Sequence, residues 1–170
     1  MAKTLGIVSL IVLALVSLAQ AGGVSLGIKA GFADPGGLAL GGLVRGTLTP
    51  KWRIEGSLEY FGEDFWRDVS INGTGAYEFP VSGTVQPYLG FGAGAHIFSW
   101  EEGWHNDWRG YHNYYTSHSN TYLGLHLLGG ADFEISKQTK IITEIKYIII
   151  TDQGGADALT ITGGVAFKLK

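Results

Sequence analysis

The sequence contains no cysteine, only 4 prolines and few charged residues, which make up 16% of the chain. The absence of cysteine excludes disulfide bonds, and it excludes the lipid-modified cysteine that a bacterial lipoprotein carries at its cleavage site. The formal net charge of −3 gives no reason to expect a nucleic-acid partner. Helical periodicity is also lacking beyond the N-terminal segment, so we expect one all-β domain without covalent cross-links.

One long apolar run is present, and it lies at the N-terminus. Lys3 precedes an apolar stretch over residues 5–19, and Ala19-Gln20-Ala21 has the small-any-small pattern of a signal-peptidase site. The stretch is short for a membrane-spanning helix, which needs about 20 residues. We therefore predict a cleaved secretory signal peptide over 1–21 and a single domain over 22–170. An uncleaved anchor is the alternative.

The remaining chain alternates between apolar residues and polar or small residues. In the last stretch, 159–169, apolar residues or glycine hold every second position, and threonine, glycine, alanine or lysine hold the positions between. This period of two is typical of a strand with two different faces. Eight stretches show it, and they lie at 24–32, 38–48, 52–60, 69–79, 86–97, 122–134, 141–150 and 159–169.

The connectors between these stretches alternate in length. Short connectors with turn residues occupy 49–51, 80–83 and 136–139. Longer connectors occupy 34–37, 62–68, 99–120 and 152–157. This alternation predicts an antiparallel up-and-down meander, with tight turns at one end and variable loops at the other.

The volume of the apolar face indicates which way the strands face. That face carries roughly forty residues, mostly large, and an eight-stranded interior is only just wide enough for side chains to fill it. The other face is small and polar, which fits a narrow lumen. We therefore predict an all-β fold, an eight-stranded antiparallel up-and-down transmembrane β-barrel, with a soluble lipocalin-like barrel as the alternative. The predicted girdle of interfacial aromatic residues is Trp52, Tyr60, Phe61, Phe79, Phe98, Trp100, Tyr122, Phe133 and Phe167.

The polar face carries charges of both signs, and buried charges are tolerable only when they are paired. If the turn at 49–51 is tight, Arg45 lies about opposite Glu55. We predict a salt-bridged network that fills the lumen, with a proton or ion path as the alternative. Its predicted members are Lys29, Arg45, Arg53, Glu55, Glu59, Glu78, Asp132, Glu134, Glu144 and Lys146.

The chain resembles the small outer-membrane β-barrel proteins of Gram-negative bacteria, the OmpA-, OmpX- and OmpW-like group. Stretches 87–96 and 128–147 look like strands of this group, and the C-terminal stretch is similar to its assembly signal. The residues that match the signal are Thr162, Gly164, Phe167 and Leu169, although Lys170 replaces the usual aromatic last residue. The resemblance implies a monomer in the outer membrane, in contact with lipid and lipopolysaccharide. It also implies insertion by the barrel-assembly machinery through the C-terminal strand.

The connector 99–120 is unusually long, and long connectors in compact domains are commonly functional. Exposed tryptophan and tyrosine are good recognition residues for proteins or sugars, and they also anchor in the lipid headgroup region. We leave these two roles open. The aromatic residues concerned are Trp100, Trp104, Trp108, Tyr111, Tyr114 and Tyr115.

Two further motifs are candidate sites of chemistry. His96 and His126 share the lumen register of neighbouring strands, so they could meet and bind Zn²⁺ or Cu²⁺, but their spacing matches no known metal site. The stretch 117–120 is similar to the His-any-Ser-Asn motif of outer-membrane lipid A deacylases. Here, however, His118 and Ser119 are adjacent, which on a strand puts them on opposite faces.

The sequence therefore predicts a non-enzymatic integral outer-membrane protein with a structural or surface-interaction role. No cofactor, metal site or catalytic residue is predicted, and the external ligand is not identified. A narrow channel for small apolar molecules, which the OmpW resemblance implies, is the alternative. A lipid A-modifying enzyme is the third possibility.

Overall fold

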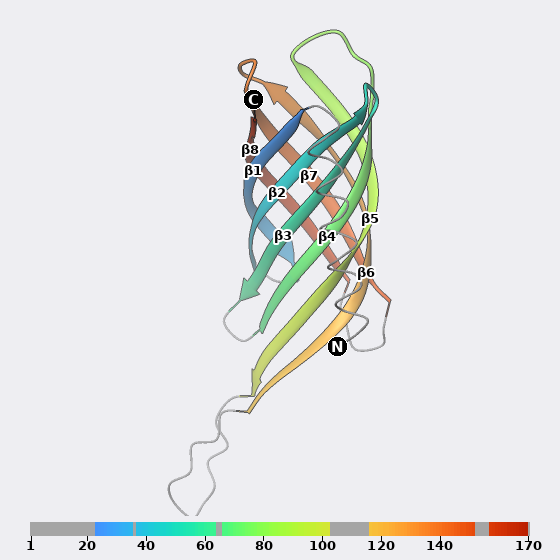
Figure 1. The fold of residues 1–170 in the computed structure, drawn as a ribbon. Helices are drawn as coiled ribbons and strands as arrows, with labels where there is room; N and C mark the ends of the chain where they lie inside the picture. The colour runs from blue at the N-terminus through green and yellow to red at the C-terminus, as the bar shows by residue number, and fades with distance from the viewer. Residues whose placement is uncertain (1–22, 36, 64–65, 103–115, 152–156, 170) are drawn as a thin grey trace, which may run out of the picture.

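The computed structural model describes residues 23–35, 37–63, 66–102, 116–151 and 157–169. These residues form eight strands, which Figure 1 shows in chain order around one barrel. No helix in this part of the chain is long and apolar enough to cross a membrane. The strands are β1 (Val24–Asp34), β2 (Gly37–Thr49), β3 (Trp52–Glu63), β4 (Trp66–Glu78), β5 (Val85–Glu102), β6 (Thr116–Glu134), β7 (Thr139–Ile150) and β8 (Ala158–Lys168).

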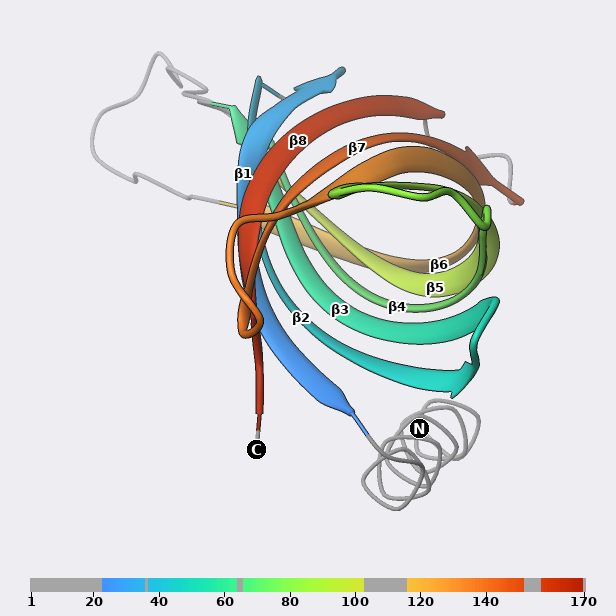
Figure 2. The same ribbon diagram turned by 90° about the horizontal axis from the view of Figure 1, so that it is seen from above.

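Each strand pairs antiparallel with the next in sequence, and β1 also pairs with β8, so the sheet closes on itself. The closing register places Ile28 opposite Val165. The view along the barrel in Figure 2 shows the strands curving around a single lumen. The predicted fold class, strand number and up-and-down order are thus confirmed.

The two ends of the barrel differ. We call the end with connectors 50–51, 79–84 and 135–138 the turn end, and the opposite end the loop end. β5 and β6 are 18 and 19 residues long, against 11 to 13 for the other strands, and their additional length lies at the loop end. Their paired ends extend beyond the neighbouring strands as a hairpin (Figure 1).

The two faces of the sheet have the polarity that the sequence predicts. Large apolar side chains are exposed on the outside, where Phe32 is 72% exposed and Ile28 is 69% exposed. Polar side chains are buried inside, where Ser70 and Thr160 have no exposed surface. A water-soluble barrel has the opposite arrangement, since its apolar side chains fill the interior.

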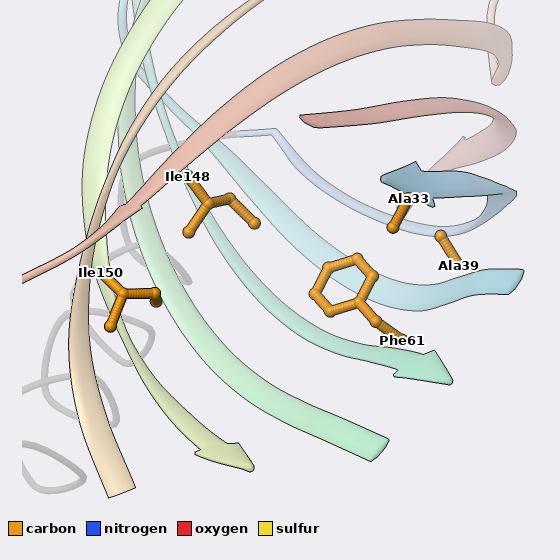
Figure 3. Packing of buried hydrophobic residues seen from close by; sticks show 5 residues of the cluster. All are labelled: Ala33, Ala39, Phe61, Ile148 and Ile150. Atoms are coloured by element: carbon orange, nitrogen blue, oxygen red, sulfur yellow. The ribbon is translucent and has the colours of Figure 1, made fainter. Parts of the chain in front are cut away.

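The apolar residues that interrupt the alternation lie inside the lumen. Leu43, Leu128, Ile142, Ile148 and Ile150 are all buried. Three inward apolar clusters result, and the largest contains Ala33, Ala39, Phe61, Ile148 and Ile150 near the loop end. In Figure 3 these side chains extend from different strands toward one another across the lumen.

The predicted aromatic girdle needs correction at four positions. Phe61 is only 3% exposed, Phe98 and Tyr122 are partly buried against the same inner cluster, and Trp100 lines a cavity inside the barrel. Phe61 follows Tyr60, which faces outward, and adjacent strand residues take opposite faces. Aromatic residues that are exposed on the outside, near the strand ends, are Trp52, Tyr60, Phe79, Phe133 and Phe167.

Glycine on the inner face provides room for the side chains of the lumen. A Cβ atom added at Gly92 would collide with the carbonyl oxygen of Gly73 and the ring of His126. A Cβ atom added at Gly73, on the outer face, would meet nothing within 4 Å. The same substitution therefore has opposite steric consequences on the two faces.

We expect Gly92→Ala to lower the free energy of unfolding by about 1–3 kcal/mol, because the added methyl group must displace backbone or the His126 ring. The matched control Gly73→Ala should change it by no more than about 0.5 kcal/mol. Urea unfolding of both variants in lipid vesicles, followed by tryptophan fluorescence, measures this difference. Equal losses for the two variants would contradict the inward packing of Gly92.

Candidate functional site in the barrel lumen

Eight buried ionisable side chains form one network inside the barrel. Four are cations and four are acids, so their formal charges sum to zero (4 − 4). Burial of charge is costly unless each group has a partner, and the balance satisfies that requirement. The cations are Lys29, Arg45, Arg53 and Lys146, and the acids are Glu55, Glu59, Asp132 and Glu144.

The two lysines form the centre of the network. Lys29 Nζ lies 2.7 Å from Glu59 Oε1 and 2.8 Å from Glu144 Oε1. Lys146 Nζ donates to Glu59 Oε2 at 2.6 Å. Lys29 is also 3.8 Å from Glu55, which links this group to the arginines. β1, β3 and β7 are therefore joined across the lumen.

The two arginines lie toward the turn end. Arg45 Nε donates to Glu55 at 2.6 Å, and its Nη1 lies 3.0 Å from Asp132. Arg53 Nη1 lies 3.1 Å from the other oxygen of Asp132. The Arg53 guanidinium is stacked over the ring of Tyr88, with Cζ 3.7 Å from the ring centroid. A cation over an aromatic face is stabilised where water is excluded.

Two residues that the sequence assigned to the network lie at its margin. Glu78 contacts Arg53 at 3.2 Å, but its side chain is 18% exposed at the turn end. Glu134, the last residue of β6, is exposed, so its assignment to the lumen network was wrong. The alternation of polar and apolar residues continues to the end of β6, but the enclosed part of the lumen ends before the last residue of that strand.

The two lumen histidines have separate partners. His96 Nδ1 lies 2.8 Å from Asp68 Oδ2, and His126 Nε2 lies 2.8 Å from the hydroxyl of Thr74. Among the described residues, no group of three or more His, Cys, Asp or Glu side chains could hold a metal ion.

Most of the long connector lies outside the part of the chain that the structure describes. Of its six aromatic residues, Trp100 alone lies in the described part, because it belongs to β5. The stretch Ser117–Asn120 falls within β6, but the side chains of Ser117 and His118 lie outside the description. The aromatic residues outside the described range are Trp104, Trp108, Tyr111, Tyr114 and Tyr115.

A cavity of about 270 Å³ lies in the barrel at the loop end. Its wall is mainly apolar, and two ionisable residues, Asp68 and His96, also line it. The sequence interpretation missed Asp68, because this residue was placed in the connector 62–68 rather than on a strand. The apolar wall consists of Pro35, Phe61, Phe98, Trp100, Ile148, Ile150 and Ala158.

Similar folds occur among solved outer-membrane proteins. A major outer membrane protein of Thermus thermophilus has a TM-score of 0.73 at 13% identity, over 86% of this chain and 99% of that one. The N-terminal β-barrel domain of Pseudomonas aeruginosa OprF has a TM-score of 0.68 at 11% identity, over 86% and 97%. Neisserial surface protein A has a TM-score of 0.66 at 16% identity, over 86% and 96%. At these identities the likeness shows the fold alone.

A comparison with curated proteins found no match. The family described as "Outer membrane protein beta-barrel domain" matches residues 5–168, which is nearly the whole chain. The match agrees with the closed antiparallel barrel, the apolar outer face and the charged interior. The chain belongs to the outer-membrane protein β-barrel domain family, as its resemblance to the small outer-membrane barrels implied.

Proposed function

We propose that this protein is a non-enzymatic outer-membrane scaffold with a closed lumen, which presents the β5–β6 hairpin at the cell surface. The observation that carries the proposal is the charge-balanced network across the lumen. It joins side chains of β1, β2, β3, β6 and β7, and Tyr88 of β5 packs against its arginines. An interior that is filled and cross-linked in this way suits a scaffold better than a pore.

The hairpin supports the surface part of the proposal. β5 and β6 remain paired from Trp100 opposite His118 to Glu102 opposite Thr116, beyond the last pairing with β4 at Trp66. The β5–β6 pair therefore extends beyond the barrel rim, and the connector 103–115 follows it in sequence. Its tryptophan and tyrosine content is typical of recognition surfaces.

The cellular setting belongs to the same proposal. We place the mature chain, after removal of residues 1–21, as a monomer in the outer membrane of a Gram-negative bacterium. Its apolar face would contact lipid and lipopolysaccharide, and the C-terminal strand would engage the assembly machinery. Family membership and the exposed apolar face support this placement.

A narrow channel for small apolar molecules is the second candidate, and the apolar cavity at the loop end favours it. The network lies between that cavity and the turn end, so a permeant molecule would have to cross paired charges. No feature of the described residues favours a lipid A-modifying enzyme.

Conductance separates a scaffold from a channel. In planar lipid bilayers, we expect the purified protein to give no stable ion-conducting steps, because the network fills the bore. A double variant, Arg45→Ser with Glu55→Ser, removes a cation and an acid together and should introduce small steps. Stable steps from the unmodified protein would contradict the closed lumen.

A further inference from the structure

The loop-end cavity combines an apolar wall with an incompletely hydrogen-bonded pair. Asp68 and His96 are 3% and 0% exposed, and both line the cavity. Asp68 Oδ2 contacts His96 Nδ1 at 2.8 Å. Within the described residues, Asp68 Oδ1 and His96 Nε2 have no hydrogen-bond partner. Buried polar atoms without partners are rare and costly, so Asp68, which lines the cavity, retains the capacity to accept a further hydrogen bond from an occupant.

The chemistry of the pair selects the polar group of that occupant. An ionised carboxylate oxygen only accepts hydrogen bonds, so a group that completes Asp68 has to donate. A charged donor gains more than a neutral one, because the site is screened from water and the hydrogen bond is charge-assisted. A ligand carboxylate would instead meet Asp68 with a charge of the same sign.

The surroundings also favour a cation. Among the longer connectors, the charged side chains that the structure describes are three acids, Asp34, Asp68 and Asp157, and one base, Arg67, so negative charge predominates at the loop end.

The wall sets the size and character of the remaining part of the ligand. Phe61, Ile148 and Ile150 present apolar surface to the cavity, which exposes little polar surface. An apolar cavity of about 150 Å³ is large enough to bind benzene. A volume of about 270 Å³ therefore admits one ring or short alkyl chain together with a polar head group.

We propose that this cavity binds a small primary amine with an apolar body, and that Asp68 selects its positive charge. The inference goes beyond the scaffold role, and binding does not depend on whether the lumen conducts. The ligand enters from the loop end, and its ammonium group lies at Asp68 while its apolar body contacts Phe61 and Ile148.

Three probes with a common ring test the proposal: benzylamine, benzyl alcohol and phenylacetate. Titration calorimetry on the protein in lipid nanodiscs, with empty nanodiscs as the blank, should show saturable binding of benzylamine at one site. Phenylacetate should bind at least about tenfold more weakly, since it brings a second negative charge to the site. Absence of saturable benzylamine binding, or equal binding of phenylacetate, would overturn the proposal.

Two variants assign the roles of the residues. Asp68→Asn should weaken benzylamine binding by about tenfold and leave benzyl alcohol unchanged. Glu78→Gln, the same kind of change at the turn end, should leave both unchanged. Ile148→Phe reduces the apolar space and should weaken both probes, which keeps the test valid if Asp68→Asn fails to fold. Full benzylamine affinity in Asp68→Asn or in Ile148→Phe would show that the cavity is not the site.

Discussion

Replacement of Glu59 by glutamine should lower the free energy of unfolding by about 3–5 kcal/mol. Glu59 contacts Lys29 at 2.7 Å and Lys146 at 2.6 Å, and its side chain is 2% exposed. Without its charge, both ammonium groups depend on Glu144 and Glu55 alone, and the network carries a net charge of +1. Removal of one partner from a buried pair is costly because the remaining charge stays away from water.

The control for this prediction is the same substitution at an exposed site. Glu134→Gln, at the exposed end of β6, should change the free energy of unfolding by no more than about 0.5 kcal/mol. The double variant Glu59→Gln with Lys146→Met restores the charge balance at three cations and three acids. Its free energy of unfolding should fall by less than the sum of the losses of the two single variants, Glu59→Gln and Lys146→Met. Urea unfolding in vesicles measures all of these proteins, and a cost for Glu59→Gln no larger than for Glu134→Gln would contradict the role of the network.

Arginine at Ile145 should destabilise the barrel in lipid by about 2–4 kcal/mol. Ile145 is 54% exposed on the outer face and lies near the middle of β7. A charge there has to lie in the hydrocarbon region of the bilayer, or reach out of it. The measurement is reversible unfolding from vesicles of defined composition.

Depth provides the control for this second prediction. Leu159 is 42% exposed on the same face, but it is the second residue of β8 and lies at the loop end. Leu159→Arg should cost only about 0–1 kcal/mol, because charges near the interface remain hydrated. If the outer face met water, both substitutions would be almost neutral. Equal costs would therefore contradict the membrane placement of the strands.

The inward or outward direction of each side chain was predictable, because it depends only on whether the residue holds an odd or an even position along its strand. Once Ile28 faces outward, Lys29 must face inward, and the same reasoning gave the pairing of Arg45 with Glu55 across one hairpin. Parity was misapplied at Phe61, which was assigned to the girdle on residue type although its neighbour Tyr60 already faced outward. Phe61 is aromatic, but its position along β3 directs its side chain into the lumen.

The contacts across the lumen were not predictable in the same way. Lys29 meets Glu144 from 115 positions away, because strand tilt and stagger bring particular residues to the same level of the barrel. The pairing of Asp68 with His96 also depends on where a strand begins. Asp68 was placed in a connector, whereas β4 begins at Trp66 and places it opposite Phe98, two positions from His96.

Apolar residues on the lumen face were noticed as exceptions, but their meaning requires the third dimension. Ile148 and Ile150 interrupt the alternation of β7, and only the arrangement around them shows that they pack against Phe61. The alternation within a sequence shows which way the side chains of one strand face. It does not show which side chains of other strands they pack against.

The bond between Lys29 and Glu144 has a consequence for the order of assembly. These residues lie on β1 and β7, so the bond cannot form until the two ends of the chain approach each other and β1 pairs with β8. Until then the inner charged groups remain hydrated, while the apolar outer face already favours contact with lipid. Closure is therefore the step at which water leaves the interior, and contacts of such long range are slow to form. A chain arrested before closure would have a hydrated, charged inner face and an exposed apolar outer face. This form most needs protection on its way to the membrane.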